Sequence, residues 1–165
     1  MRSPAETPAE GASGERDLDR LIATMRPELR PGRFVFVSVP RVPDGVDPVA
    51  WVREEEGITL VLDQDEADRH GLLYGFVAAM ITLRVHSALD AVGLTAAVSR
   101  ALAEAEISCN VVAGYFHDHL FVPAERAERT TQVLLELAES AVTETPGPTG
   151  RRSVGPAAPS PSVSA

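Results

Sequence analysis

The chain lacks several residue types and patterns that would mark out common classes of protein. Its 165 residues include no lysine, one tryptophan and one cysteine, Cys109. A single cysteine cannot form a disulfide within the chain or a thiolate zinc site, and in its apolar segment we interpret Cys109 as a small buried hydrophobic side chain. No run approaches the roughly 18 apolar residues of a membrane-spanning helix, and the first residues lack the apolar part of a secretory signal. We therefore expect a cytoplasmic protein.

Positive charge is also scarce. The formal net charge is −9 at pH 7, and residues 17–142 hold 20 acidic side chains against 11 arginines. Nucleic acids and anionic membranes are bound by positive surfaces. A folded part this acidic predicts no nucleic-acid partner and no membrane partner.

Both ends of the chain are rich in Pro, Ala, Gly, Ser and Glu. Segments 1–16 and 143–165 cannot bury enough apolar surface to offset the entropy lost on ordering. We expect both to be disordered tails. The folded part then lies between them.

The first half of that part contains a helix followed by apolar strands. Asp17 is a plausible helix cap, and leucine, isoleucine and methionine follow at helical spacing. Residues 26–32 contain two prolines, so we expect them only to end this helix. Runs rich in Val, Phe and Ile predict strands. The expected elements are helices over 17–25 and 63–71, strands over 34–39 and 58–63, and a short strand or helical turn over 49–57.

The second half has the order strand, helix, strand, strand, helix. Two helices on one face of an antiparallel sheet would bury the apolar residues of this order. It matches a ferredoxin-like unit without its last strand. The expected elements are strands over 77–87, 107–114 and 117–123 and helices over 94–106 and 124–140.

Several segments resemble a known family. "MITLRVHSALDAVGLTAAV", "ISCNVVAGY" and "HDHLFVP" are similar to the ACT domain, a βαββαβ regulatory module. "LRPGRFVFVSVP" and "EEEGITLVLDQDEADRHGL" are similar to the first unit of small bacterial proteins made of two such domains. The resemblance implies an α+β fold of two packed ferredoxin-like units, over 17–75 and 76–142. We expect strand 34–39 to pair into the sheet of the second unit, and strand 80–87 to bridge both units.

The resemblance also implies a function. ACT domains commonly bind an amino acid at an interface between domains, often across a dimer. It therefore implies a ligand-binding regulatory homodimer that is not an enzyme, needs no cofactor and controls a protein in another chain. An interaction subunit without a small ligand and a small metal-dependent enzyme remain as alternatives.

The candidate ligand site centres on Gly93, just before the helix that starts at Leu94. Glycine lets a backbone approach a ligand closely, and the first amide groups of a helix can hold a carboxylate. An ordinary helix start is the alternative. Asp90 could meet an α-amino group or cap a turn. Asn110, in an otherwise apolar strand, could bond a ligand or nearby backbone, because a buried amide needs a partner. The candidate ligand-binding residues are Ser87, Asp90, Val92, Gly93, Leu94, Thr95, Asn110, Val112, Gly114, Tyr115 and His117.

His117 and His119, two residues apart, could share a strand face, and His86 could approach them. A metal site needs a third ligand and usually a fourth, and no HExxH motif or spaced carboxylate cluster accompanies these histidines. We predict no metal site and no catalytic residues. We expect the two histidines to shape a domain interface, where His117 or Asp118 could contact a ligand.

Overall fold

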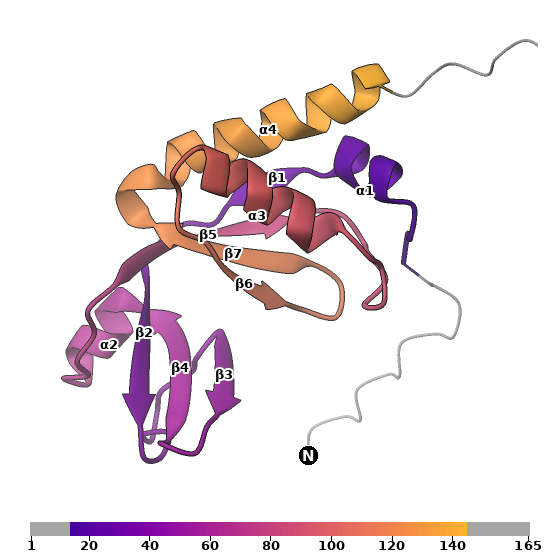
Figure 1. The fold of residues 1–165 in the computed structure, drawn as a ribbon. Helices are drawn as coiled ribbons and strands as arrows, with labels where there is room; N and C mark the ends of the chain where they lie inside the picture. Colours follow the sequence, from indigo (N-terminus) through magenta and orange to yellow (C-terminus); the bar gives the residue numbers. More distant parts are fainter. Residues whose placement is uncertain (1–13, 145–165) are drawn as a thin grey trace, which may run out of the picture.

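A single antiparallel sheet organises the chain, and the helices pack on one of its faces (Figure 1). This computed structural model describes residues 14–144. The elements are α1 (Leu18–Thr24), β1 (Pro27–Leu29), β2 (Phe34–Val39), β3 (Ala50–Arg53), β4 (Ile58–Asp63), α2 (Gln64–Arg69), β5 (Val77–Leu83), α3 (Leu94–Glu104), β6 (Asn110–Ala113), β7 (Asp118–Pro123), a 3₁₀ turn (Ala124–Arg126) and α4 (Ala127–Glu144). The strand order is β3-β4-β2-β5-β7-β6, and β1 also pairs with β5.

The strand β5 belongs to both halves of the sheet. Its start pairs with β2, where Phe34 lies opposite Ala78. Its end pairs with β1, where Leu29 lies opposite Ile81. Along its other side β5 pairs with β7 from Ala78 to Thr82. The expected bridging strand is therefore present, with the bounds Val77–Leu83.

Two ferredoxin-like units share this strand. The first contains β2, β3, β4, α2 and the start of β5, and a loop over residues 40–49 stands where a first helix would be expected. The second contains β5, α3, β6, β7 and α4, with β1 as its last strand. The predicted α+β fold of two such units is confirmed. The order of the strands along the chain differs from their order in the sheet. The strand β1 comes before the first unit in the sequence, but it pairs with β5 in the second unit.

Strand 34–39 pairs into the sheet of the second unit, as expected, but β2 reaches β5 only through Phe34 and Val35. The strand that completes the unit is β1, in the segment that we expected only to end a helix. A strand of three residues is too short to show alternation, and Pro27 is tolerated there because it is the first residue of the strand.

The ends of the described part also differ from the expected tails. Glu15 forms a parallel bridge with Ser87, so ordered structure begins before residue 17. At the other end, α4 continues to Glu144. The remaining residues of both predicted tails, 1–13 and 145–165, lie outside the described residues.

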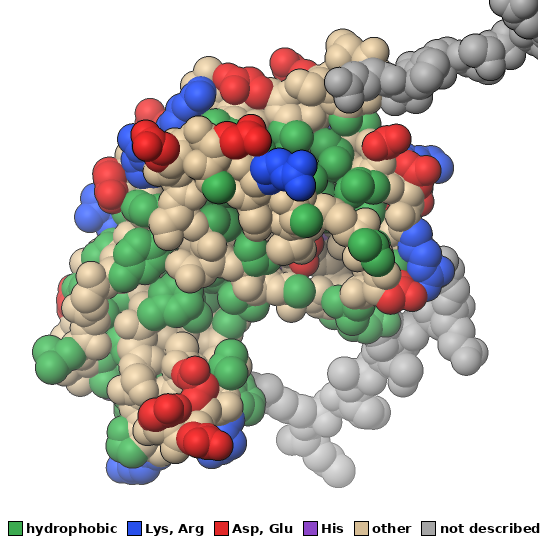
Figure 2. All heavy atoms as spheres, in the orientation of Figure 1, with side chains coloured by type: hydrophobic (Ala, Val, Ile, Leu, Met, Phe, Trp, Pro, Cys, Tyr) green, Lys and Arg blue, Asp and Glu red, His purple; other side chains and the backbone are tan. Residues whose placement is uncertain are grey.

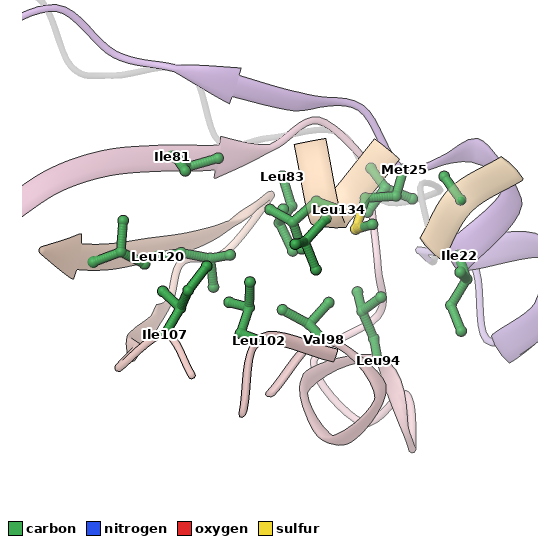
Figure 3. Close-up of a cluster of buried hydrophobic side chains, with 14 of the residues drawn as sticks. Ile22, Met25, Ile81, Leu83, Leu94, Val98, Leu102, Ile107, Leu120 and Leu134 are labelled. Atoms are coloured by element: carbon green, nitrogen blue, oxygen red, sulfur yellow. The ribbon is translucent and has the colours of Figure 1, made fainter. Parts of the chain in front are cut away.

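The main core lies between the second unit's part of the sheet and helices α1, α3 and α4 (Figure 3). On α3, Leu94, Val98 and Leu102 recur every fourth residue and share one buried face. On β5, Ile81 and Leu83 alternate toward the same helices. Burial of each such side chain stabilises the fold by about 1.5–3 kcal/mol. The helix α1 belongs to this core, although it is the first helix of the chain described. The fully buried members are Leu21, Ile81, Leu83, Val98, Leu102, Leu120, Val122 and Leu134.

The opposite face of the sheet carries no helix within the described residues. There the ring of Phe121 meets those of Phe34 and Phe36 edge-on, with centroids 6.0 and 5.5 Å apart. These contacts join the first unit to the second across β5. The molecule is hollowed between the strands β2–β4 and the second unit (Figure 2). No helix among residues 14–144 is long and apolar enough to cross a membrane.

Phe121→Ala tests this junction. Phe121 is 1% exposed, so its removal leaves a cavity between the units, and the free energy of unfolding should fall by about 3–5 kcal/mol. Urea denaturation measures the change. Leu73→Ala is the control, because Leu73 is 92% exposed and should change stability by less than about 0.5 kcal/mol. A Phe121→Ala variant as stable as the control would show that the aromatic contact does not hold the units together.

Candidate functional site

The loop between β5 and α3, residues 84–93, carries many of the predicted ligand residues. Ser87, Asp90 and Tyr115 line one hollow of about 200 Å³. The loop and the β6–β7 hairpin therefore meet at the same end of the sheet. The hollow is also lined by Gly14, Arg16, His86, Ala88 and Leu89, which sequence reasoning did not select.

Asp90 has a partner that the sequence did not suggest. The Arg16 Nε donates to Asp90 Oδ1 at 3.1 Å, and Arg16 Nη2 donates to Oδ1 at 3.0 Å and to Oδ2 at 2.8 Å. This hydrogen bonding by Arg16 lowers the pKa of the Asp90 carboxyl. Both side chains are more than half exposed. No sequence signal could have paired them, because 74 positions separate them and we assigned Arg16 to a tail.

Gly93 is required by the backbone at the start of α3. Its φ is +109°, in the left-handed region, and a Cβ atom there would lie 2.7 Å from Leu18 Cδ2. No side chain of the described residues caps this helix, so its first amide groups lack a side-chain acceptor. Of the neighbouring predicted residues, Leu94 is buried in the core, whereas Val92 and Thr95 are exposed.

The turn between β6 and β7 lies beside this loop. The Gly114 N–H donates to the His117 carbonyl at 3.0 Å, and His117 Nδ1 donates to the Val85 carbonyl at 3.2 Å. The rings of Tyr115 and Phe116 pack edge-on at 4.9 Å, and Phe116 lies 5.5 Å from the ring of His86. This turn therefore brings Tyr115 and His117 to the loop, whereas Gly114 bonds within the turn itself.

Asn110 and Val112 lie elsewhere, on the helix-free face. Asn110 pairs with Phe121 and Val112 with His119, so both side chains point to the same face of the sheet. Asn110 is exposed, which corrects the expectation that its amide is buried. The reason is that β6 is an edge strand of the sheet. Neither residue lines the hollow at the loop.

Of the polar side chains of β7, His119 bonds within the sheet. His119 Nδ1 lies 3.1 Å from Thr82 Oγ1. Burial lowers the pKa of His119, and nearby His117 acts in the same direction, whereas burial raises the pKa of Asp118. Cys109 is half-buried, and burial raises its pKa to about 11. Across the described range no group of three or more His, Cys, Asp or Glu side chains could hold a metal ion.

A second hollow, of about 400 Å³, lies between α1, α3 and α4. Its lining is Leu18, Gly93, Ala96, Ala97, Arg100, Ala101, Glu104 and Leu137. Gly93 borders this hollow and not the one at Ser87. The predicted site therefore divides between the loop, the start of α3 and the helix-free face, and the loop brings together the most polar groups.

Two ferredoxin-like units that share a strand, the first with a loop in place of its first helix, define the class of the protein as a tandem α+β module. Sequence models of the ACT domain match residues 13–79 and 76–136. The chain belongs to the ACT-domain family and carries two such domains in tandem. Domains of this family are typically ligand-binding and regulatory.

Solved structures show the same arrangement. A protein of unknown function from Vibrio cholerae, described as a possible transport protein, is 46% identical with a TM-score of 0.67, over 73% of this chain and 95% of that one. A protein from Agrobacterium tumefaciens is 20% identical with a TM-score of 0.55, over 69% and 89%. The ligand-free regulatory subunit of aspartate kinase from Thermus thermophilus is 11% identical with a TM-score of 0.53, over 69% and 96%. The last two share the fold alone. No curated protein matches the chain.

Gly93→Ala tests the geometry at the start of α3. An alanine at φ +109° is strained and should lower the free energy of unfolding by about 1–3 kcal/mol. Thermal or urea denaturation measures this. Gly75→Ala is the matched control, since a Cβ atom there meets nothing within 4 Å and the variant should be neutral or slightly stabilised. Equal stability of the two variants would contradict the required left-handed geometry.

Proposed function

We propose that this protein is an amino-acid-binding sensor that acts through ACT-type domain interfaces, without catalysis, as a cytoplasmic homodimer. The hollow at the loop after β5 is the observation that carries this proposal. Its wall holds a carboxylate, a guanidinium and a hydroxyl, from Asp90, Arg16 and Ser87. An amino acid presents an ammonium, the charge that matches the Asp90 carboxylate.

The size of the hollow supports a ligand of this class. Its volume is about 200 Å³. A small metabolite fits such a space, whereas most drug-sized ligands need about 300 Å³ or more. In this proposal Asp90 receives the ammonium, and the exposed side chains of Leu89 and Tyr115 border the ligand side chain.

A second copy would cover the open side of this site. Leu89, Val92, Tyr115 and Phe116 form an apolar rim at this end of the molecule, and all four are exposed. Exposed apolar groups gathered around a binding site are typical of an interaction surface. We propose that the rim of one subunit packs on its partner and encloses the ligand.

Light scattering of the purified full chain tests the dimer. We expect twice the mass of one chain at micromolar concentration, and Tyr115→Ser combined with Phe116→Ser should shift the protein toward one chain, because it removes apolar contact area. Leu73→Ser, at another exposed leucine, is the control and should leave the mass unchanged. A wild-type mass of one chain would contradict the dimer.

A thermal-shift screen against each proteinogenic L-amino acid tests the ligand. We expect at least one to raise the unfolding midpoint, because a ligand at about 100 times its dissociation constant stabilises by about 2.7 kcal/mol, which corresponds to several degrees. Asp90→Asn should abolish the shift by removing the charge that meets the ammonium.

Asp44→Asn is the control for this experiment, since Asp44 is an exposed carboxylate in the loop after β2. It should keep the full shift. If no amino acid stabilises the wild type, the proposed sensor function is wrong.

An interaction subunit without a small ligand is the second candidate function. The edge strand β3 favours it, because Val49, Trp51 and Val52 beside or within it are more than half exposed. Exposed edge strands offer unpaired backbone groups to another chain. Failure of the ligand screen together with capture of a strand-forming partner through Trp51 would favour this function.

A further inference from the structure

The segment Gly14–Asp17, named here the N-terminal strap, lies across the loop that forms the hollow. The Glu15 N–H donates to the His86 carbonyl at 2.8 Å, and the Ala88 N–H donates to the Glu15 carbonyl at 3.0 Å. These two bonds form a single parallel β-bridge between Glu15 of the strap and Ser87 of the loop. The strap therefore contacts the residues on either side of Ser87.

The contact at Gly14 is close enough to exclude any side chain. A Cβ atom on Gly14 would lie 2.4 Å from the Ala88 nitrogen and 2.5 Å from the Ser87 carbonyl carbon. These are backbone atoms, which cannot move aside as a flexible side chain can. Glycine at this position therefore allows the strap to lie directly on the loop.

Arg16 engages the carboxylate that the proposed function assigns to the ligand. Its guanidinium uses both oxygens of Asp90, in three hydrogen bonds of 2.8–3.1 Å. A ligand ammonium that approached Asp90 from the hollow would compete for the same oxygens. Arg16 thus stands where a cationic group of a ligand would stand.

The strap is held by groups that solvent reaches. The side chains of Arg16 and Asp90 are 61% and 68% exposed, and exposed ion pairs contribute little to stability. Glu15 forms an ion pair with Arg20 of α1 at 3.2 Å. The Asp17 side chain caps the same helix by accepting a hydrogen bond from the Arg20 N–H at 2.9 Å. The strap is therefore fixed to α1 at one end and held weakly to the loop at the other.

We propose that the N-terminal strap is an intramolecular competitor for the ligand site, and that a ligand ammonium displaces Arg16 from Asp90 and releases the strap from the loop. This inference rests on the proposed function and adds its regulation. Ligand binding would thereby free the start of the chain, a change that another protein can detect. The competition by Arg16 also favours ligands that carry a cationic group, since a ligand without one cannot replace the guanidinium at Asp90.

Amide hydrogen exchange of the full-length protein, without any ligand, tests how the strap is held. Arg16→Gln should speed exchange at the Glu15 and Ala88 amides by about two- to fivefold, as expected for the loss of an exposed ion pair. Gly14→Ala should produce the same change without altering charge. Arg126→Gln removes one positive charge from the 3₁₀ turn before α4 and should leave both amides unchanged. Unchanged exchange in both strap variants would overturn the proposal.

Titration with each proteinogenic L-amino acid, and with its N-acetyl form, tests the competition. An amino acid that binds the wild type should speed exchange at Glu15 and Ala88, and Arg16→Gln should bind it about two- to fivefold more tightly. The N-acetyl forms, which lack the α-ammonium, should have no such effect. Weaker binding to Arg16→Gln would show that Arg16 holds the ligand and would overturn the competition.

The two proposals fail in different ways. If no amino acid binds the wild type, the proposed function loses its support. The same titration of Arg16→Gln and Gly14→Ala then tests whether the strap blocks the site. Binding that appears only in these variants would support an occluding strap. No binding in any variant would overturn the competition.

Discussion

The shared pairing of β5 is the constraint on which the rest of the structure depends. This strand bonds to β2 and β1 along one side and to β7 along the other. Ala79, Ile81 and Leu83 face the helices, while Ala78 and Thr82 face the opposite side and are also buried. Both faces of β5 are covered, so one strand contributes to the helix-side core of the second unit and to the contact between the units on the opposite face. The units therefore behave as one body, although their sequences lie one after the other.

This interlocking explains how the beginning of the chain reaches the candidate site. The last strand of the second unit comes from β1, and α1 packs in the core of the same unit. The residues before α1 must then lie near the loop after β5, where Glu15 bridges Ser87 and Arg16 binds Asp90. A fold in which each unit used only its own consecutive residues would leave the N-terminal segment with the first unit. The position of the strap thus follows from the pairing of β1 with β5, which places a strand from the start of the chain in the second unit.

The candidate site is small, polar on its wall and open to solvent on one side. Its polar groups are a loop carboxylate, a guanidinium from the strap and the hydroxyl of Ser87, and no group of metal ligands accompanies them among the described residues. In the proposed function this site selects a small charged molecule and reports its presence through a weakly held segment.

Local pattern determined most of the elements and the family. Helical spacing in α3, the Val- and Phe-rich run of β2 and the cap at Asp17 depend on neighbouring residues only, so they can be read along the chain. The strand β1 has three residues and shows no such pattern, and only its pairing with β5 makes it a strand. The residues that line the hollow show the same difference. Ser87, Asp90 and Tyr115 were selected from their own segments, whereas Arg16 was not. The exposure of Asn110 was not predicted either. A contact over 74 positions and the place of β6 at the sheet edge are properties of the tertiary structure, because they depend on which distant segments the shared strand brings together.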